Sequence, residues 1–160
     1  MEPNVALPIE RARVEDAEDI LNLQYLCYQS EAALYNDYSI APLTQSLAEI
    51  KAEMAQSVVL VCPLGTEIIG SVRGRECGGR CHIGRLIVHP RMQRKGLGTR
   101  LMAAIEAAFP AVSAFELFTG DRSEGNLRLY QRLGYRKFKV ENAGPVVKLV
   151  FLEKLRALSR

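Results

Sequence analysis

The sequence has no apolar run that approaches the ~20 residues needed to cross a bilayer, so we expect no membrane-spanning helix. The excess of positive over negative charge is also small, because 21 Lys and Arg residues against 18 Asp and Glu leave a net charge of only +3. Proteins that bind nucleic acid in bulk are usually far more basic. Repeats and linkers rich in glycine, serine or proline are absent too. We therefore expect one globular domain, residues 1–160.

Cysteine is sparse, with four residues in the chain. Cys77 and Cys81 flank the pair Gly78–Gly79, a spacing that invites a metal hypothesis. A structural zinc site normally needs four ligands, usually from two such pairs, and the sequence offers no second pair. The pattern favours a Gly-Gly turn with two cysteines facing each other across a hairpin, and we expect no metal.

The first residues, Met1–Asn4, carry no positive patch followed by an apolar stretch, which a signal peptide would need. We therefore expect a cytoplasmic protein, in which thiols remain reduced.

Hydrophobic periodicity predicts elements of both kinds at short spacing. The fold class expected is α/β, with a mixed (α+β) sheet and the order β-α-α-β-β-β-α-β-α-β-β. A polar and aromatic loop is expected between the first two helices, over residues 30–42. Strands are expected over residues 9–13, 57–62, 67–75, 82–88, 113–119, 135–141 and 146–155, and helices from about 14 to 28, 44 to 55, 97 to 109 and 124 to 133.

A glycine-bearing loop, residues 89–99, joins an expected strand to an expected helix. The first N–H groups of a helix lack internal partners and attract anions, and glycine lets the backbone approach an oxyanion closely. Four cationic side chains of the same segment add positive charge: those of Arg91, Arg94, Lys95 and Arg100. The alternative is a plain turn with solvated charges. Two common nucleotide-binding patterns, G-x-x-x-x-G-K-[ST] and G-x-G-x-x-G, are absent, the second because position 101 is Leu.

Two motifs in this order resemble the GNAT superfamily of N-acetyltransferases. Gln93-x-x-Gly96-x-Gly98 matches the signature [Gln/Arg]-x-x-Gly-x-[Gly/Ala], and it follows a strand that ends in Val-His-Pro. About 30 residues later, Asn126-x-x-x-Tyr130-x-x-x-Gly-Tyr resembles a second segment of that family. The order of elements is similar over nearly the whole chain.

This resemblance implies an acyltransferase that uses acetyl-CoA as co-substrate. The strands that end at Val88 and near Thr119 are then expected to splay apart around the pantetheine arm. The pyrophosphate is expected on the backbone N–H groups of residues 93–99. The cofactor-binding residues implied are Ile87, Val88, Gln93, Arg94, Lys95, Gly96, Gly98, Thr99 and Asn126.

Transfer of an acyl group to an amine requires a neutral amine, and it is helped by a proton for the departing thiolate. Tyr130 is expected to supply that proton, since a phenol is protonated at neutral pH, and it shares a helix face with Asn126. A packed aromatic residue is the alternative. Two residues compete as the base, His82 near the start of the third strand of the meander and Glu116 on the next strand. Either could instead be an outward-facing strand residue.

The acceptor is expected to be a small-molecule amine or a peptide amine, with no nucleic-acid or membrane partner, and a homodimer is left open. Binding residues for it are sought in the loop between the first two helices, where acids could attract a cationic amine; solvation of this loop is the alternative. Two rival functions are a non-catalytic acetyl-CoA sensor and a small nucleic-acid-binding protein. The candidate acceptor residues are Glu31, Tyr35, Asp37 and Tyr38.

Overall fold

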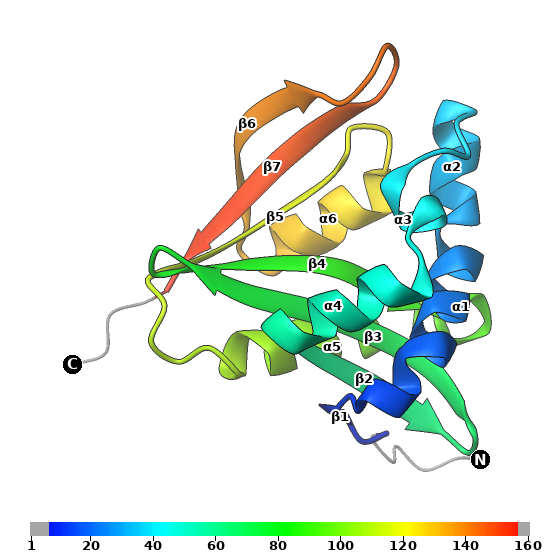
Figure 1. The fold of residues 1–160 in the computed structure, drawn as a ribbon. Helices are drawn as coiled ribbons and strands as arrows, with labels where there is room; N and C mark the ends of the chain where they lie inside the picture. Colours follow the sequence, from blue (N-terminus) through cyan, green and yellow to red (C-terminus); the bar gives the residue numbers. More distant parts are fainter. Residues whose placement is uncertain (1–6, 157–160) are drawn as a thin grey trace.

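One mixed sheet forms the centre of the protein in this computed structural model, which describes residues 7–156. In that part of the chain the sheet has seven strands in the order β1-β2-β3-β4-β5-β7-β6 (Figure 1). All neighbours are antiparallel except β4 and β5, so the expected mixed sheet is confirmed. The segment Met1–Asn4 lies outside the described residues. The strands are β1 (Glu10–Arg11), β2 (Val58–Leu64), β3 (Glu67–Cys77), β4 (Arg80–Val88), β5 (Ala114–Gly120), β6 (Arg136–Asn142) and β7 (Lys148–Leu155).

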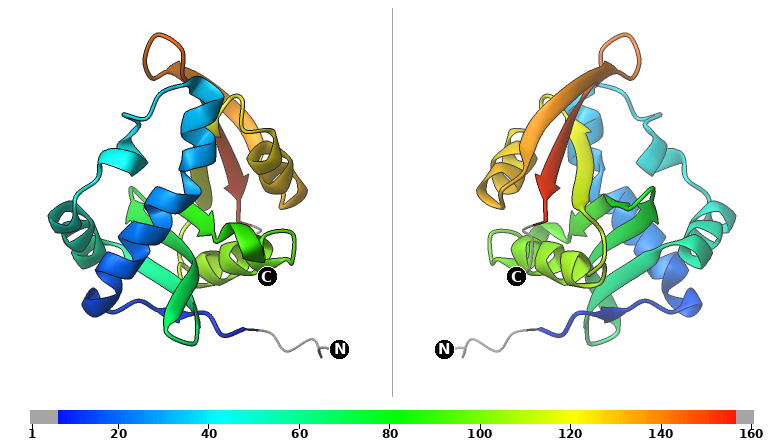
Figure 2. Two further views of the ribbon diagram at one scale, coloured as in Figure 1. Left: turned by 90° about the vertical axis from the view of Figure 1, so that its right-hand side faces the viewer. Right: turned by 90° about the vertical axis from the view of Figure 1, so that its left-hand side faces the viewer.

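Helices cover both faces of the sheet, as the two side views show (Figure 2). None of those within residues 7–156 is long and apolar enough to cross a membrane. They are η1 (Val14–Asp16), α1 (Ala17–Cys27), α2 (Gln29–Tyr35), α3 (Ala41–Thr44), α4 (Leu47–Gln56), η2 (Pro90–Met92), α5 (Leu97–Ala107) and α6 (Glu124–Arg132).

Strand β2 shows why the sheet has two cores. Its run of apolar residues places Val59 and Val61 against α1 and α4, while Leu60 and Cys62 lie in the larger cluster with α5 and α6. Because successive side chains of a strand point to opposite faces, a continuous apolar run is buried on both sides, as the sequence predicted.

The expected loop over residues 30–42 is wrong in part. Residues Gln29–Tyr35 form helix α2, and Ala41–Thr44 form the short helix α3. Helix α2 buries Ala32 and Tyr35, one turn apart, and it ends at Asn36, which adopts a left-handed conformation (φ 49°) that asparagine tolerates well. Helix α4 begins at residue 47, about three residues later than expected, because Ser46 forms a reciprocal cap with Glu49.

The hairpin between β3 and β4 turns at Gly78 and Gly79, which both have positive φ. Cys81 lies opposite Glu76 in the register, and Cys77 lies opposite Arg80. The two cysteines therefore do not face each other directly, contrary to expectation. All four cysteines are free thiols, and no group of three or more metal-ligating side chains occurs within residues 7–156.

The parallel strands β4 and β5 pair over only three residues each. The last pair is His82 with Glu116, although β4 continues to Val88 and β5 to Gly120. Beyond this point the two strands separate, as Figure 1 shows. The splay expected from the sequence is confirmed, and it opens the sheet beside the start of α5.

Candidate functional site

The loop before α5 presents unsatisfied backbone donors. Arg94 (φ 64°) and Gly96 (φ 83°) are both left-handed, which turns the chain sharply into the helix. Within residues 7–156, the backbone N–H groups from Arg94 to Thr99 have no hydrogen-bond acceptor, and the first bond of the helix is donated by Arg100. Six consecutive free donors at a helix N-terminus are an arrangement that can hold an anion.

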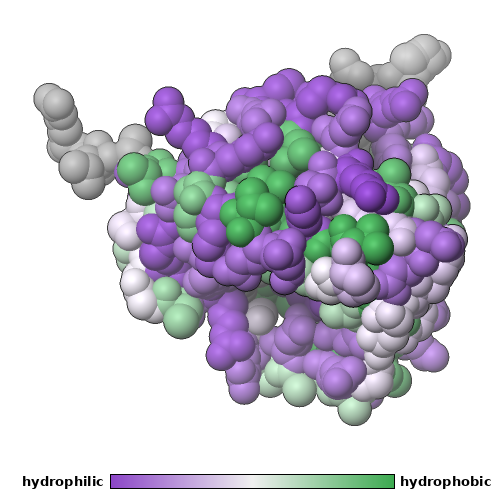
Figure 3. Space-filling view, turned by 90° about the horizontal axis from the view of Figure 1, so that it is seen from above, coloured by the Kyte–Doolittle hydropathy of each residue, from purple (hydrophilic) through white to green (hydrophobic). Residues whose placement is uncertain are grey.

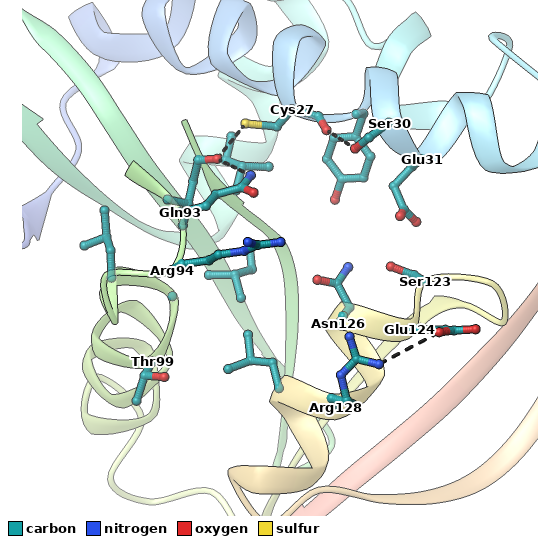
Figure 4. Close-up of a pocket in the computed structure, with 18 of the residues that line it drawn as sticks. Cys27, Ser30, Glu31, Gln93, Arg94, Thr99, Ser123, Glu124, Asn126 and Arg128 are labelled. Atoms are coloured by element: carbon teal, nitrogen blue, oxygen red, sulfur yellow. Dashed lines mark hydrogen bonds and ion pairs between the residues drawn. The ribbon is translucent and has the colours of Figure 1, made fainter. Parts of the chain in front are cut away.

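A cleft of about 830 Å³, which we call the large cleft, lies over this loop. Figure 4 shows Gln93 and Arg94 on one side of it, and Asn126 and Arg128 of α6 on the other. Four arginines from two separate segments line the large cleft, which makes its rim cationic: Arg94, Arg122, Arg128 and Arg132.

The cationic side chains of the loop do not all serve this cleft. Arg91 pairs with Glu67 on β3, and Arg100 donates to the backbone carbonyl of Leu7. Lys95 is not among the lining residues. Of the four cations that were expected to add charge here, only Arg94 lines the large cleft, and the other three arginines that line it come from the segment around α6.

The end of β4 forms the floor of the large cleft, with Ile87 and Val88 among its lining residues. The carbonyl oxygen of Val88 accepts a hydrogen bond from the Gln93 side chain (3.1 Å) and one from the Cys27 thiol (3.3 Å). Burial raises the pKa of Cys27 to about 11, so this thiol stays protonated and unreactive. Gln93 thus fixes the loop to the strand end.

A second cavity of about 460 Å³, which we call the small cavity, lies on the other side of the splay. It is lined by residues 83–86 of β4 and 117–120 of β5, by the segment from α2 to α3, and by the β6–β7 turn. The two hollows share four lining residues: Tyr28, Glu31, Leu86 and Asn126. They therefore meet where the strands part.

Tyr130 lines the small cavity from α6. Its ring is only 6% exposed and packs edge-on against Tyr135 at 6.1 Å between centroids. Its hydroxyl has no hydrogen-bond partner among the residues that the structure describes. Burial raises the pKa of Tyr130, and the nearby Tyr28 and Glu31 add to this, so the phenol keeps its proton at neutral pH.

The other candidate catalytic residues lie elsewhere. His82 and Glu116 form the last pair before the strands separate and line neither hollow. The Glu116 carboxylate accepts a hydrogen bond from Arg80 at 2.7 Å and lies 3.3 Å from Nδ1 of His82. Arg80 is also bound to Glu153. This group is a surface ion-pair cluster, and its geometry does not support either residue as the base.

Three of the four candidate acceptor residues line the small cavity: Glu31, Tyr35 and Asp37. Tyr38 does not, and it is exposed. The hydroxyl of Tyr35 donates to Asp121 at 2.9 Å and accepts from the Arg122 backbone at 2.8 Å, so Tyr35 fixes the loop before α6. The carboxylate of Asp37 accepts two hydrogen bonds from Ser39, which lower its pKa.

Glu31 differs from Asp37 in lining both hollows, and it has no ion-pair partner among residues 7–156. Its side chain points from α2 towards the segment that holds Ser123 and Asn126 (Figure 4). Burial raises the pKa of Glu31, and the Ser123 hydroxyl offsets only part of this rise. Glu31 is therefore the unpaired carboxyl group at the junction of the two hollows.

Comparison with protein families identifies the fold. The model of the acetyltransferase (GNAT) family matches residues 17–135 of the chain. The chain belongs to the GNAT acetyltransferase family. No curated protein sequence matches it.

Solved structures with low sequence identity share this GNAT fold. The PaiA N-acetyltransferase from Thermoplasma acidophilum, in complex with coenzyme A, has a TM-score of 0.78 and 16% identity, over 95% of this chain and 100% of that one. The ribosomal-protein-S18-alanine N-acetyltransferase from Escherichia coli has a TM-score of 0.79 and 10% identity, over 97% of both chains. YncA, a putative acetyltransferase from Salmonella typhimurium with its cofactor acetyl-CoA, has a TM-score of 0.71 and 21% identity, over 98% and 99%.

Sequence reasoning missed several residues of this GNAT site. Tyr28 lies at the end of the first expected helix and carries no motif, yet it lines both hollows. Arg122 and Ser123 precede α6 and carry no motif of their own. Arg85 could have been recognised from the sequence, since it is a charged residue inside the otherwise apolar stretch 83–88.

Proposed function

We propose that this protein transfers the acetyl group of acetyl-CoA to a primary amine, with Tyr130 as the acid. One observation carries the proposal. The large cleft and the small cavity meet at the opening between β4 and β5, where the carboxyl group of Glu31 lines both hollows and the protonated phenol of Tyr130 lines the small cavity.

The large cleft suits acetyl-CoA in both charge and backbone chemistry. The six free N–H groups and four arginines match a pyrophosphate, since charge-assisted hydrogen bonds to such groups are the strong ones. A Cβ atom built on Gly96 would meet no atom within 4 Å, so the space over the loop is open. Acetyl-CoA supplies the activated acyl group as a thioester when it is bound.

Tyr130 would act as the acid of the reaction and Glu31 as the base. The nitrogen of the acceptor attacks the thioester carbonyl, the C–S bond breaks, and the nitrogen loses a proton. We assign the hydrogen bond to the departing sulfur to Tyr130, because its hydroxyl has no protein partner. Glu31 would hold the incoming ammonium group and receive its proton, directly or through water. His82 and Glu116, the bases proposed from sequence, are replaced in this role by Glu31.

The test is release of free thiol from acetyl-CoA in the presence of a panel of small primary amines and short peptides. Turnover that depends on the amine supports the proposal. The alternative function is a non-catalytic acetyl-CoA sensor, which would bind coenzyme A tightly and turn over no amine in the panel.

A first prediction concerns the pH dependence of kcat/KM. Glu31 must be ionised to act, and burial raises its pKa above the ordinary 4.5. Activity of the wild-type protein should therefore be lost as the pH falls through this raised pKa. Glu31→Gln should lower kcat/KM at neutral pH by about 10²-fold and remove this acidic limb, measured as a pH–rate profile.

The matched control is Glu116→Gln, since Glu116 is the rival carboxylate on β5. This variant should keep the wild-type shape of the pH–rate profile. Loss of the acidic limb in Glu116→Gln, with the limb intact in Glu31→Gln, would reverse the assignment.

A further inference from the structure

Arg85 occupies an unusual position in β4. The pairing with β3 shifts between Ser71 and Arg73, so that Ser71 lies opposite Ile87 and Arg73 lies opposite Gly84. Strand β4 thus holds one more residue than β3 in this interval, which is a β-bulge. Arg85 sits in it with φ 52°. A left-handed backbone is costly for a side chain of this kind, and such strain is often found at functional sites.

Arg85 lines the small cavity and an adjoining groove beside α4, and no protein anion is bound to its guanidinium among residues 7–156. It lies 6.0 Å from the ring centroid of Tyr28, and its Nε atom is buried with no hydrogen-bond partner. Within residues 7–156 it makes no hydrogen bond and no ion pair. A partly buried cation with an unsatisfied donor is costly unless another molecule supplies the acceptor.

Three acids that share a hollow with Arg85 are committed to other groups. Glu53 binds Arg73 at 2.6 Å through one carboxylate oxygen and Gln45 at 2.7 Å through the other. Glu49 accepts the N–H of Ser46 in the cap of α4, and Asp37 is bound by Ser39. Arg73, the neighbouring guanidinium, is thus paired, whereas Arg85 is not.

The opposite charge enters the same cavity from another element. Glu31 of α2 lines it and has no cationic partner. Both side chains lie near Tyr28: burial raises the pKa of Tyr28, and Arg85 and Glu31 then act on it in opposite directions. The remaining walls contain apolar side chains of β5, the β6–β7 turn, β7, and the segment that leads into α3, among them Leu117, Phe118, Val147, Leu149, Ile40 and Pro42.

We propose that the acceptor is a small amino acid, whose carboxylate binds Arg85 while its amine faces Glu31. This deepens the proposed function and rests on it. A guanidinium fork matches a carboxylate through two parallel hydrogen bonds, and the single unpaired guanidinium of the small cavity matches one such group. The cavity volume of about 460 Å³ is of the size that holds a small molecule, and its apolar walls suit an aliphatic side chain.

A linear polyamine fits this arrangement poorly, because its second ammonium group would meet Arg85. Like charges facing each other inside a cavity cost binding energy, so the same guanidinium that selects a carboxylate would select against a second cation.

The experiment compares three primary amines with the same isobutyl side chain: leucine, leucinamide and 3-methylbutylamine, which has hydrogen in place of the carboxylate. The wild-type protein should use leucine with a kcat/KM about 10- to 100-fold above those of the other two, as expected for a hydrogen-bonded charged group. Arg85→Asn removes the charge, and asparagine tolerates the left-handed backbone. It should raise the KM for leucine about 10- to 100-fold and change the KM for 3-methylbutylamine by less than about twofold.

Two further variants complete the design. Arg85→Lys should recover part of the preference for leucine, because it restores the charge without the fork. Arg75→Asn should keep the full preference, since Arg75 is exposed on β3 and lines neither hollow. Thermal shift with coenzyme A verifies that each variant is folded and keeps its large cleft.

The outcomes separate the two proposals. Equal or better use of leucinamide or 3-methylbutylamine by the wild-type protein would overturn the inference and leave the acetyltransferase proposal standing. An unchanged leucine preference in Arg85→Asn would also overturn it. Coenzyme A binding without turnover of any of the three acceptors, or of the broader amine and peptide panel, would reject the proposed function itself.

Discussion

Gly96→Glu is expected to abolish binding of acetyl-CoA while the protein stays folded. Gly96 lines the large cleft and precedes the first residue of α5. A carboxylate there would accept the free N–H groups of residues 94–99 in place of a phosphate. It would also repel the phosphate directly. We expect a loss of affinity of at least about 100-fold for two lost charge-assisted contacts, measured by calorimetry.

Stability is expected to fall only modestly in this variant. The left-handed conformation of Gly96 (φ 83°) costs about 1–2 kcal/mol for a residue with a Cβ atom, but no neighbour lies within 4 Å of that atom. The control is Gly96→Asn, which also places a Cβ atom on this left-handed backbone but carries no charge. It should lose less than about tenfold in affinity for acetyl-CoA. If both variants lose affinity equally, the backbone geometry of the loop decides binding and the charge argument is wrong.

Several residues that line the large cleft can be recognised from local sequence. A glycine-bearing loop between a strand and a helix is recognisable because left-handed turns and helix N-termini have local rules. Gln93, Gly96, Gly98 and Asn126 accordingly line the cleft as expected. The buried strand β2 and the helix α5 also follow from apolar periodicity alone.

The parts that depend on register were not predictable in this way. His82 and Glu116 looked suitable by residue type, but a strand pairing that ends at these two residues leaves both outside the hollows. Conversely, Arg85 enters the small cavity because one extra residue shifts the pairing of β4 with β3. Periodicity predicts which face a side chain takes only while the register is regular, and a bulge breaks that rule.

The shape of the surface around the small cavity was likewise hidden from the sequence. Residues 29–35 form a helix that turns Glu31 inward, although their polar composition suggested a loop. The face seen in Figure 3 is mostly hydrophilic, with separate hydrophobic patches. Leu34 and Val146 are apolar yet exposed. Tertiary structure decides this exposure, and local composition does not specify it.

Tyr130→Phe is expected to lower kcat by about 10²-fold, the size of one general-acid contribution, with little change in the KM for either substrate. The hydroxyl has no protein partner among residues 7–156, so its removal leaves no orphaned group and the ring can keep its edge contact with Tyr135. Fold stability should therefore change by less than about 1 kcal/mol. Steady-state thiol release gives kcat and KM, and thermal unfolding gives the stability.

Tyr28→Phe is the informative comparison, because Tyr28 lines both hollows, whereas Tyr130 lines the small cavity alone. Burial raises the pKa of both hydroxyls, so both are donors at neutral pH, and position alone separates them. Tyr130 lies on α6 one turn beyond Asn126, which lines the large cleft, whereas Tyr28 lies under the guanidinium of Arg85. Tyr28→Phe should hence alter the KM of the acceptor more than kcat. If kcat collapses in Tyr28→Phe and survives in Tyr130→Phe, the phenol that protonates the sulfur is Tyr28.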